Sequence, residues 1–232
     1  MTNILENSAQ QFIELIFPRS CVVCQCKLIQ SEQYLCLRCL LQMPRTNHHK
    51  QRENVMEQLF YGRVPIERGC SFFEFKKGSQ YQQILHELKY RGQKQLGEYI
   101  GVLFGTSLKE DASISSADLI CPVPLHPRKE KKRGYNQSYH IAVGLSQSLG
   151  IPINNSNLRR CTHSSTQTRK SRWERWQNVE SIFELQKPEQ FEGKHLILID
   201  DVVTTGATLE ACATAILSRC NARVSVLTLA IA

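Results

Sequence analysis

Residues 196–208 read Leu-Ile-Leu-Ile-Asp-Asp-Val-Val-Thr-Thr-Gly-Ala-Thr. The four apolar residues 196–199 predict a strand that is buried on both faces of a parallel sheet. Asp200 and Asp201 follow at the carboxyl end of this strand, where open α/β sheets bind their ligands. A short turn of small and hydroxyl residues comes next, and a helical run follows from Leu209 to Ser218. The stretch therefore predicts an α/β fold with a binding edge at the two acids.

The turn after the acids has the composition of an anion-binding site. Its N–H groups can surround a phosphate, Thr204, Thr205 and Thr208 add hydroxyl donors, and the helix N-terminus adds a favourable dipole. Two carboxylates would repel a bare phosphate, but they suit sugar hydroxyls or a phosphate-bound Mg²⁺. A strand–turn–helix with an ordinary Asp or Thr cap is the alternative for any single residue. The whole string favours a sugar that carries both a phosphate and a metal-bound anionic group.

Length and composition set the outline of the protein. With 232 residues, 41% of them hydrophobic, the chain can form one α/β domain and a small appendage. Its first residues lack the pattern of an export signal, and no run of about 18 apolar residues occurs. We therefore expect a soluble, cytoplasmic protein without membrane insertion. In a reducing compartment, the paired Cys-x-x-Cys motifs among the ten cysteines favour metal ligation over disulfides.

The N-terminal part contains two Cys-x-x-Cys pairs. Four thiolates from two such pairs suit the closed tetrahedral shell of structural Zn²⁺, and the predicted ligands are Cys21, Cys24, Cys36 and Cys39. Cys26, His48 or His49 is the alternative ligand, and a redox role is disfavoured because no βαβ pattern surrounds the pairs. We predict an amphipathic helix and zinc ribbon in residues 1–45, a polar linker in 46–68, and the main domain in 69–232. The apolar face of that helix comprises Ile4, Leu5, Phe12, Ile13 and Ile16.

The main domain shows an alternation of strand and helix patterns. Strands are predicted at 70–75, 119–123, 196–199 and 224–231, and helices at 81–90, 96–108, 138–149 and 209–218. This order predicts a mainly parallel sheet flanked by helices.

Positive charge is concentrated in two segments. Residues 126–138 hold five basic side chains against one acid, and residues 157–175 hold six against one. Such clusters attract polyanions, although a solvated charged face is the alternative. The second segment also holds both tryptophans, which either anchor it to the core or stack on the bases of single-stranded nucleic acid. The nucleic-acid candidates are Lys131, Lys132, Arg169, Arg172, Trp173, Arg175 and Trp176.

Two further motifs combine cations with conformationally special residues. In Lys89-Tyr90-Arg91-Gly92, two cations lie beside a glycine at which the backbone can approach an anion. The segment from Pro122 to Gln137 follows a predicted strand, and its prolines predict a stiffened loop. The guanidinium groups of Arg128 and Arg133 in this segment suit pyrophosphate oxygens.

Together, the cysteine pairs, both basic motifs, residues 160–178 and the 196–208 string resemble the ComF family of competence proteins and its GntX-like relatives. The resemblance implies a type I phosphoribosyltransferase fold that binds 5-phosphoribosyl-1-pyrophosphate (PRPP) with Mg²⁺. It assigns Asp200 and Asp201, our candidate catalytic residues, to the ribose 2′- and 3′-hydroxyls. It assigns the pyrophosphate to 89–92 and the 5′-phosphate to Val203, Thr204, Thr205, Gly206, Ala207 and Thr208.

The resemblance also implies a role in natural transformation, through uptake or cytoplasmic handling of incoming single-stranded DNA. A competence helicase and a recombination mediator are the implied partners. The first alternative is an active enzyme that transfers phosphoribosyl from PRPP to an unidentified nitrogenous acceptor, because the phosphate turn is complete. The second is a structural protein whose zinc ribbon and basic segments form a docking platform.

Overall fold

The computed structural model describes residues 18–161 and 182–232. Its strands are β1 (Gly69–Glu74), β2 (Leu119–Pro122), β3 (Leu158–Arg160), β4 (Phe183–Leu185), β5 (His195–Val203) and β6 (Arg223–Ile231). Its helices are α2 (Leu37–Leu41), η1 (His48–Lys50), α3 (Val55–Gln58), α4 (Gln82–Tyr90), α5 (Lys94–Leu108), α6 (Ala112–Ser115), α7 (Pro127–Arg133), α8 (Gln137–Leu149), η2 (Pro188–Gln190) and α10 (Ala207–Leu217). Within the described ranges, no helix combines the length and apolar character needed to cross a lipid bilayer.

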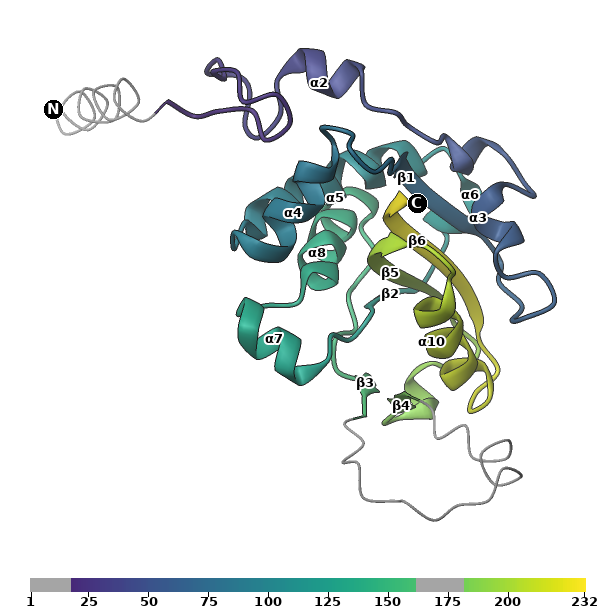
Figure 1. Ribbon diagram of the computed structural model, residues 1–232. Coiled ribbons are helices and arrows are strands. Elements are labelled where there is room, and N and C mark those ends of the chain that lie inside the picture. The colour runs from purple at the N-terminus through teal and green to yellow at the C-terminus, as the bar shows by residue number, and fades with distance from the viewer. Residues whose placement is uncertain (1–17, 162–181) are drawn as a thin grey trace, which may run out of the picture.

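The main sheet has four parallel strands in the order β1-β6-β5-β2 (Figure 1). β5 and β6 pair along their length, from His195 opposite Arg223 to Val203 opposite Ile231. Every strand predicted for the main domain is present, and the predicted helices coincide with α4, α5, α8 and α10 to within a few residues. The predicted parallel sheet flanked by helices is therefore confirmed.

β5 is buried on both faces, as its apolar sequence predicts. Ile197 and Ile199 belong to the core on the side of α5 and α8, whereas Leu196 and Leu198 belong to the core on the side of α10. Figure 1 shows these helices on opposite sides of the sheet. Because a parallel strand between two helical layers has no solvent face, apolar residues occupy consecutive positions.

The two helices α5 and α8 pack backbone against backbone. A Cβ atom added at Gly144 of α8 would overlap the carbonyl oxygen of Glu98 and lie 2.8 Å from the Cα atom of Gly101. Glycine is required at this crossing because any side chain would separate the helices. The close contact fixes α8 against the sheet and so places its first residues at the carboxyl end of β5, where the acids lie.

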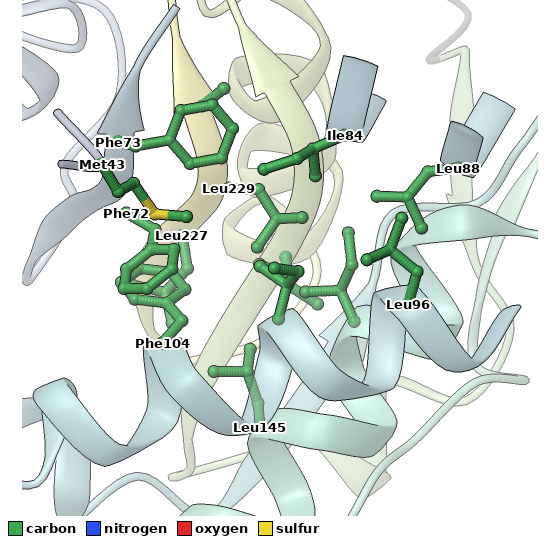
Figure 2. Close-up of a cluster of buried hydrophobic side chains, with 14 of the residues drawn as sticks. Met43, Phe72, Phe73, Ile84, Leu88, Leu96, Phe104, Leu145, Leu227 and Leu229 are labelled. Atoms are coloured by element: carbon green, nitrogen blue, oxygen red, sulfur yellow. The ribbon is translucent and has the colours of Figure 1, made fainter. Parts of the chain in front are cut away.

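The cysteine-rich part, residues 18–45, packs directly on the main domain. The hydroxyl of Tyr81 donates to the carbonyl oxygen of Cys39 at 2.9 Å, and the rings of Tyr34 and Tyr99 lie 5.4 Å apart. Met43 joins the hydrophobic core on the α5 side of the sheet, where Figure 2 shows it with Phe72. The cysteine-rich part and the main domain therefore share one core.

The predicted linker, residues 46–68, is also packed on the main domain. It contains η1 and α3, and the side chains of Met56 and Phe60 are buried in the core on the α10 side. Arg68 is only 1% exposed and forms ion pairs with Glu57 and Asp111. The segment thus contributes to the core, and the domain boundaries at 45 and 69 stay predictions.

One expected loop is helical. The prolines of 122–137 predict a stiffened loop, but residues 127–133 form α7. Pro127 occupies the first turn, where its missing N–H costs nothing, and the His126 ring accepts a hydrogen bond from the amide of Arg128 at 3.2 Å. Gly134 ends the helix in the left-handed conformation, with φ 78°. These start and stop signals outweigh the loop-forming tendency of the remaining prolines.

Candidate functional site

The acidic pair lies near the end of β5, within reach of α4 and α8. Ser138 Oγ donates to Asp200 Oδ1 at 2.9 Å, and the amide of Asp201 donates to the same oxygen at 2.9 Å. Lys89 Nζ lies 3.1 Å from Asp201 Oδ2. No described residue donates to the other two carboxylate oxygens, Asp200 Oδ2 and Asp201 Oδ1, and neither is sealed from solvent. Each acid therefore offers one oxygen to a ligand.

The electrostatics of the pair favour a ligand that supplies donors or positive charge. Burial and the neighbouring Asp201 carboxylate raise the pKa of Asp200 from 3.8 to about 7. The hydrogen bonds from Asp201 and Ser138 and the charge of Lys89 act in the opposite direction without overcoming it. The surroundings therefore do not fully stabilise a second negative charge in the acidic pair. Hydroxyl groups that donate to the open oxygens would stabilise it.

The turn after β5 presents backbone donors. Gly206 is the N-cap of α10 with φ 77°, and no side chain caps the helix. A non-glycine residue would be strained there, and its Cβ would meet the Phe60 ring at 3.3 Å. Thr204, Thr205 and Thr208 are exposed around these amides. The turn and Asp200 line one hollow of about 70 Å³, roughly the space of two water molecules. A carboxylate and a turn of backbone amides and hydroxyls therefore meet in a single depression.

Two residues of the predicted linker support the turn from behind. The ring of Phe60 lies against Gly206, and Arg63 Nη1 donates to the carbonyl oxygen of Thr205 at 2.7 Å. The same guanidinium forms an ion pair with Glu210 in the first turn of α10. Sequence reasoning missed both residues because neither belongs to a motif and their partners are more than 140 positions away.

The two basic motifs meet beside the acidic pair. The hydroxyl of Tyr135 donates to the carbonyl oxygen of Leu88, and the Arg133 guanidinium lies 5.7 Å from the centre of the Tyr90 ring. These contacts hold the end of α4 against the segment that precedes α8. Lys89 reaches the acids from this junction. The structure therefore brings together residues that the sequence places in three separate motifs.

Other predicted basic residues lie at the surface. Arg91 and Gly92 are exposed directly after α4, and Arg128, Lys131 and Lys132 are exposed on α7. Gly92 adopts a positive φ of 70°. The remaining nucleic-acid candidates lie outside the described residues, and these are Arg169, Arg172, Trp173, Arg175 and Trp176.

The four predicted metal ligands converge. Their sulfur atoms all lie within 4.8 Å of one another, and the residues are Cys21, Cys24, Cys36 and Cys39. Hydrogen bonds from Cys26 lower the pKa of Cys24 to about 6, which favours the thiolate form that metals bind. Four sulfur donors at this spacing could hold a tetrahedral ion such as zinc.

The alternative ligands separate into near and distant groups. Cys26 Sγ lies 3.2 Å from Cys24 Sγ, so it stays an alternative ligand. The His48 ring instead accepts a hydrogen bond from the amide of Ser71 at 3.3 Å, on the first strand of the main sheet. His49 lies 3.9 Å from Glu110. The histidines are therefore engaged with the main domain.

Comparison with known proteins adds a domain match and several relatives. The family model described as "Phosphoribosyl transferase domain" matches residues 136–231, from the start of α8 to β6. This range contains Ser138, the acids and the turn. With the parallel sheet and the cysteine cluster, the match confirms the predicted type I phosphoribosyltransferase-like fold with an N-terminal cysteine module.

Three relatives have names that concern competence or DNA. Competence protein F of Haemophilus influenzae is 36% identical over 102 residues, which are 44% of each chain. DNA utilization protein YhgH of Salmonella typhimurium is 30% identical over 146 residues, 62% of this chain and 63% of that protein. Competence protein ComFC of Bacillus subtilis is 27% identical over 200 residues, 86% of this chain and 78% of that protein. The first two matches span less than two thirds of the relative's length.

Proposed function

We propose that the chain is a ComF-family competence protein that binds PRPP and handles incoming single-stranded DNA, a proposal supported by the names of its relatives and by the phosphoribosyl transferase domain match. The observation that carries the PRPP part is the shared hollow, where Asp200 faces the uncapped turn at the start of α10. PRPP contains the matching groups, since a vicinal pair of ribose hydroxyls lies between a 5′-phosphate and a pyrophosphate.

Each part of the site then has a role in binding. The open oxygens of Asp200 and Asp201 accept the two ribose hydroxyls, and the amides after Gly206 bind the 5′-phosphate. Lys89 and Arg133, at the junction of the basic motifs, face the pyrophosphate. Mg²⁺ bound to the pyrophosphate would neutralise part of its charge beside the carboxylates. Binding therefore moves Lys89 from a protein carboxylate toward a ligand anion.

Calorimetric titration of the full-length protein with PRPP and Mg²⁺ tests this assignment. Asp201→Asn should weaken PRPP binding at least tenfold, because a hydrogen bond from a sugar hydroxyl to a charged acceptor is replaced by one to a neutral amide. Glu189→Gln, which changes an exposed acid on η2, is the matched control and should bind as the parent does. Equal affinity in all three proteins would contradict the assignment.

The proposal includes Zn²⁺ at the four-cysteine cluster. The residues fit this ion because four thiolates from two tight turns form a closed shell with no open position. When bound, Zn²⁺ would supply folding energy and no catalytic chemistry. The shared core with the main domain means that the metal would also stabilise the base of β1 and α4.

For single-stranded DNA we propose a path along α7. Lys131 and Lys132 are exposed there, and Glu130 is the helix's only acid. Such a surface binds a phosphate backbone with little sequence preference and strong salt dependence. The tryptophan-containing segment lies outside the described residues and is the second candidate for DNA contact, on the basis of its sequence. Crosslinking of an oligonucleotide carrying a photoreactive base, followed by peptide mapping, tests the path.

A cytoplasmic location and protein partners complete the proposal. The cysteine-rich part exposes Ile29, Leu37 and Leu41, and both Ile29 and Leu37 donate their amides to the Glu32 carboxylate. The backbones of Ile29 and Leu37 are therefore neighbours, and Leu41 follows Leu37 by one turn of α2; a competence helicase or recombination mediator would dock on this part of the surface. Leu41→Asp should abolish capture of such a partner by the full-length protein while PRPP affinity stays unchanged. Capture equal to that of the parent would exclude this surface.

A further inference from the structure

Among the described residues, the uncharged side chain that hydrogen-bonds to the acidic pair is Ser138, which ends the basic segment 126–138 and is given no role by the sequence analysis. We propose that Ser138 is a positioning residue that fixes the Asp200 carboxylate so that one oxygen stays available to a sugar hydroxyl. This inference rests on the proposed PRPP function. It goes further by naming the group that orients the acid and by predicting which part of the ligand that group affects.

The serine is itself held in place by a chain of hydrogen bonds. The Asn136 side chain donates to the carbonyl oxygen of Val123, directly after β2, and accepts from the amide of Ser138 at 3.1 Å. Ser138 is 3% exposed, and its hydroxyl donates to Asp200 Oδ1 at 2.9 Å. The chain thus connects the end of β2, the start of α8 and the end of β5. A hydroxyl anchored at this point has little freedom to turn away.

Two donors on one oxygen define the orientation of the carboxylate. Oδ1 of Asp200 accepts from Ser138 and from the amide of Asp201, so rotation of the carboxylate would break both hydrogen bonds. Oδ2 accepts from no described residue and so stays available to a ligand, and Asp200 lines the same hollow as the turn. Without the hydroxyl, one of the two constraints is removed and the plane of the carboxylate can turn to other angles. A ligand would then have to order the carboxylate on binding.

A purely architectural role for Ser138 makes a different prediction. If the residue served only to start α8, its loss would disturb the helix and weaken binding of every ligand near it. If it orients Asp200, its loss would weaken ligands that contain ribose and leave pyrophosphate binding intact. The ratio of the two affinities therefore separates the two roles.

The experiment compares PRPP with inorganic pyrophosphate, both with Mg²⁺, by calorimetric titration of the full-length protein. Ser138→Ala should weaken PRPP binding about tenfold or more, because a hydrogen bond to a charged group is removed, and should change pyrophosphate affinity less than twofold. Ser146→Ala, at a partly buried position on the same helix, is the matched control and should behave as the parent.

A second pair of variants controls for shape. Ser138→Thr keeps the hydroxyl and Ser138→Val replaces it with a methyl group of the same size, so any strain from the added branch is common to both. The threonine variant should bind PRPP at least fivefold more tightly than the valine variant. The role of Ser138 would be overturned if Ser138→Ala bound PRPP as the parent does and the threonine and valine variants bound it equally. Parallel losses of PRPP and pyrophosphate affinity would overturn it as well. Absence of PRPP binding by the parent protein would instead overturn the proposed function and this inference with it.

Discussion

Two clusters of charged side chains lie inside this protein, and each contains one cation and two carboxylates. In the first, Arg68 binds Glu57 and Asp111 and also donates to three backbone carbonyl oxygens. In the second, Lys89 binds Asp201, and Asp200 accepts from Ser138. The compositions match, but the hydrogen bonding differs.

The first cluster is saturated and the second is not. The remaining oxygens of the Glu57 and Asp111 carboxylates accept backbone amides of Glu53, Ser113 and Ile114. The second cluster leaves one oxygen open on each acid. A saturated cluster fixes the position of chain segments, whereas unmet hydrogen-bonding capacity at a surface hollow marks a place for a ligand. The number of carboxylate oxygens that lack a hydrogen-bond donor therefore distinguishes a candidate ligand site from a structural ion pair better than the burial of the residues does.

The cysteine cluster is a third group to compare with these two. Loss of its metal should lower the unfolding free energy more than any other change considered below. Four cysteine sulfur atoms lie within 4.8 Å of one another, and as thiolates they would repel each other unless an ion were bound between them. Removal of the metal with a chelator, or Cys39→Ser, should unfold the cysteine-rich part. The full-length protein should lose several kcal/mol of unfolding free energy because the core is shared. Urea unfolding with parallel metal analysis checks this.

Cys220→Ser is the control, since this cysteine is buried near the end of α10 and lies outside the cluster. It should retain one equivalent of zinc per chain. A parent protein that contains no metal and unfolds at the same urea concentration with and without chelator would exclude a structural ion.

Arg68→Ala should have the next largest effect. It leaves two buried carboxylates without their cation, and breaking a buried pair in this way costs about 3–5 kcal/mol. Urea unfolding at pH 7 measures the loss, and Arg219→Ala, at an exposed position after α10, is the control with an expected change below about 0.5 kcal/mol. A loss below about 1 kcal/mol would show that the saturated cluster does not hold the 46–68 segment in place.

The sequence predicts the unsaturated cluster better than the saturated one. Asp200 and Asp201 could be found because they follow an uninterrupted apolar strand and precede a turn of unusual composition. Arg68 could not, since its partners Glu57 and Asp111 lie on either side of it in segments with no motif of their own. Ser138 shows the same limit, because a hydrogen bond across 62 positions depends on how α8 packs against α5. Local sequence pattern identifies the candidate binding groups, whereas the contacts around them depend on tertiary packing.

Asp200→Asn should raise the free energy of unfolding, whereas the preceding changes lower it, and the change should be smaller. The raised pKa means that folded Asp200 holds a proton between about pH 4 and pH 7, where the unfolded chain has released it. The parent therefore loses stability as the pH rises through this window. The asparagine variant avoids the loss and should be more stable than the parent by about 1 kcal/mol at pH 8, with no advantage at pH 4. Urea unfolding at both pH values tests this.

We expect the same Asp200→Asn variant to lose PRPP binding. The open carboxylate would then lower the stability of the protein and at the same time be required for its function. If the Asp200→Asn protein is less stable than the parent at pH 8, groups within the chain stabilise the Asp200 carboxylate. The acidic pair would then be saturated in the same way as the Arg68 cluster.

The smallest effect on stability is expected on α7, where charge is neither buried nor paired. Lys131→Gln with Lys132→Gln should change the unfolding free energy by less than about 0.5 kcal/mol, because both side chains are exposed. It should reduce the salt dependence of single-stranded DNA binding by about 0.7 in log–log slope for each DNA phosphate that the lysines no longer bind. Arg172→Gln with Arg175→Gln is the parallel variant in the second basic segment. Fluorescence anisotropy of a labelled oligonucleotide across a salt series compares the two. If only the arginine variant lowers the slope, the DNA path bypasses α7, and if neither does, the positive charge of both segments serves solvation alone.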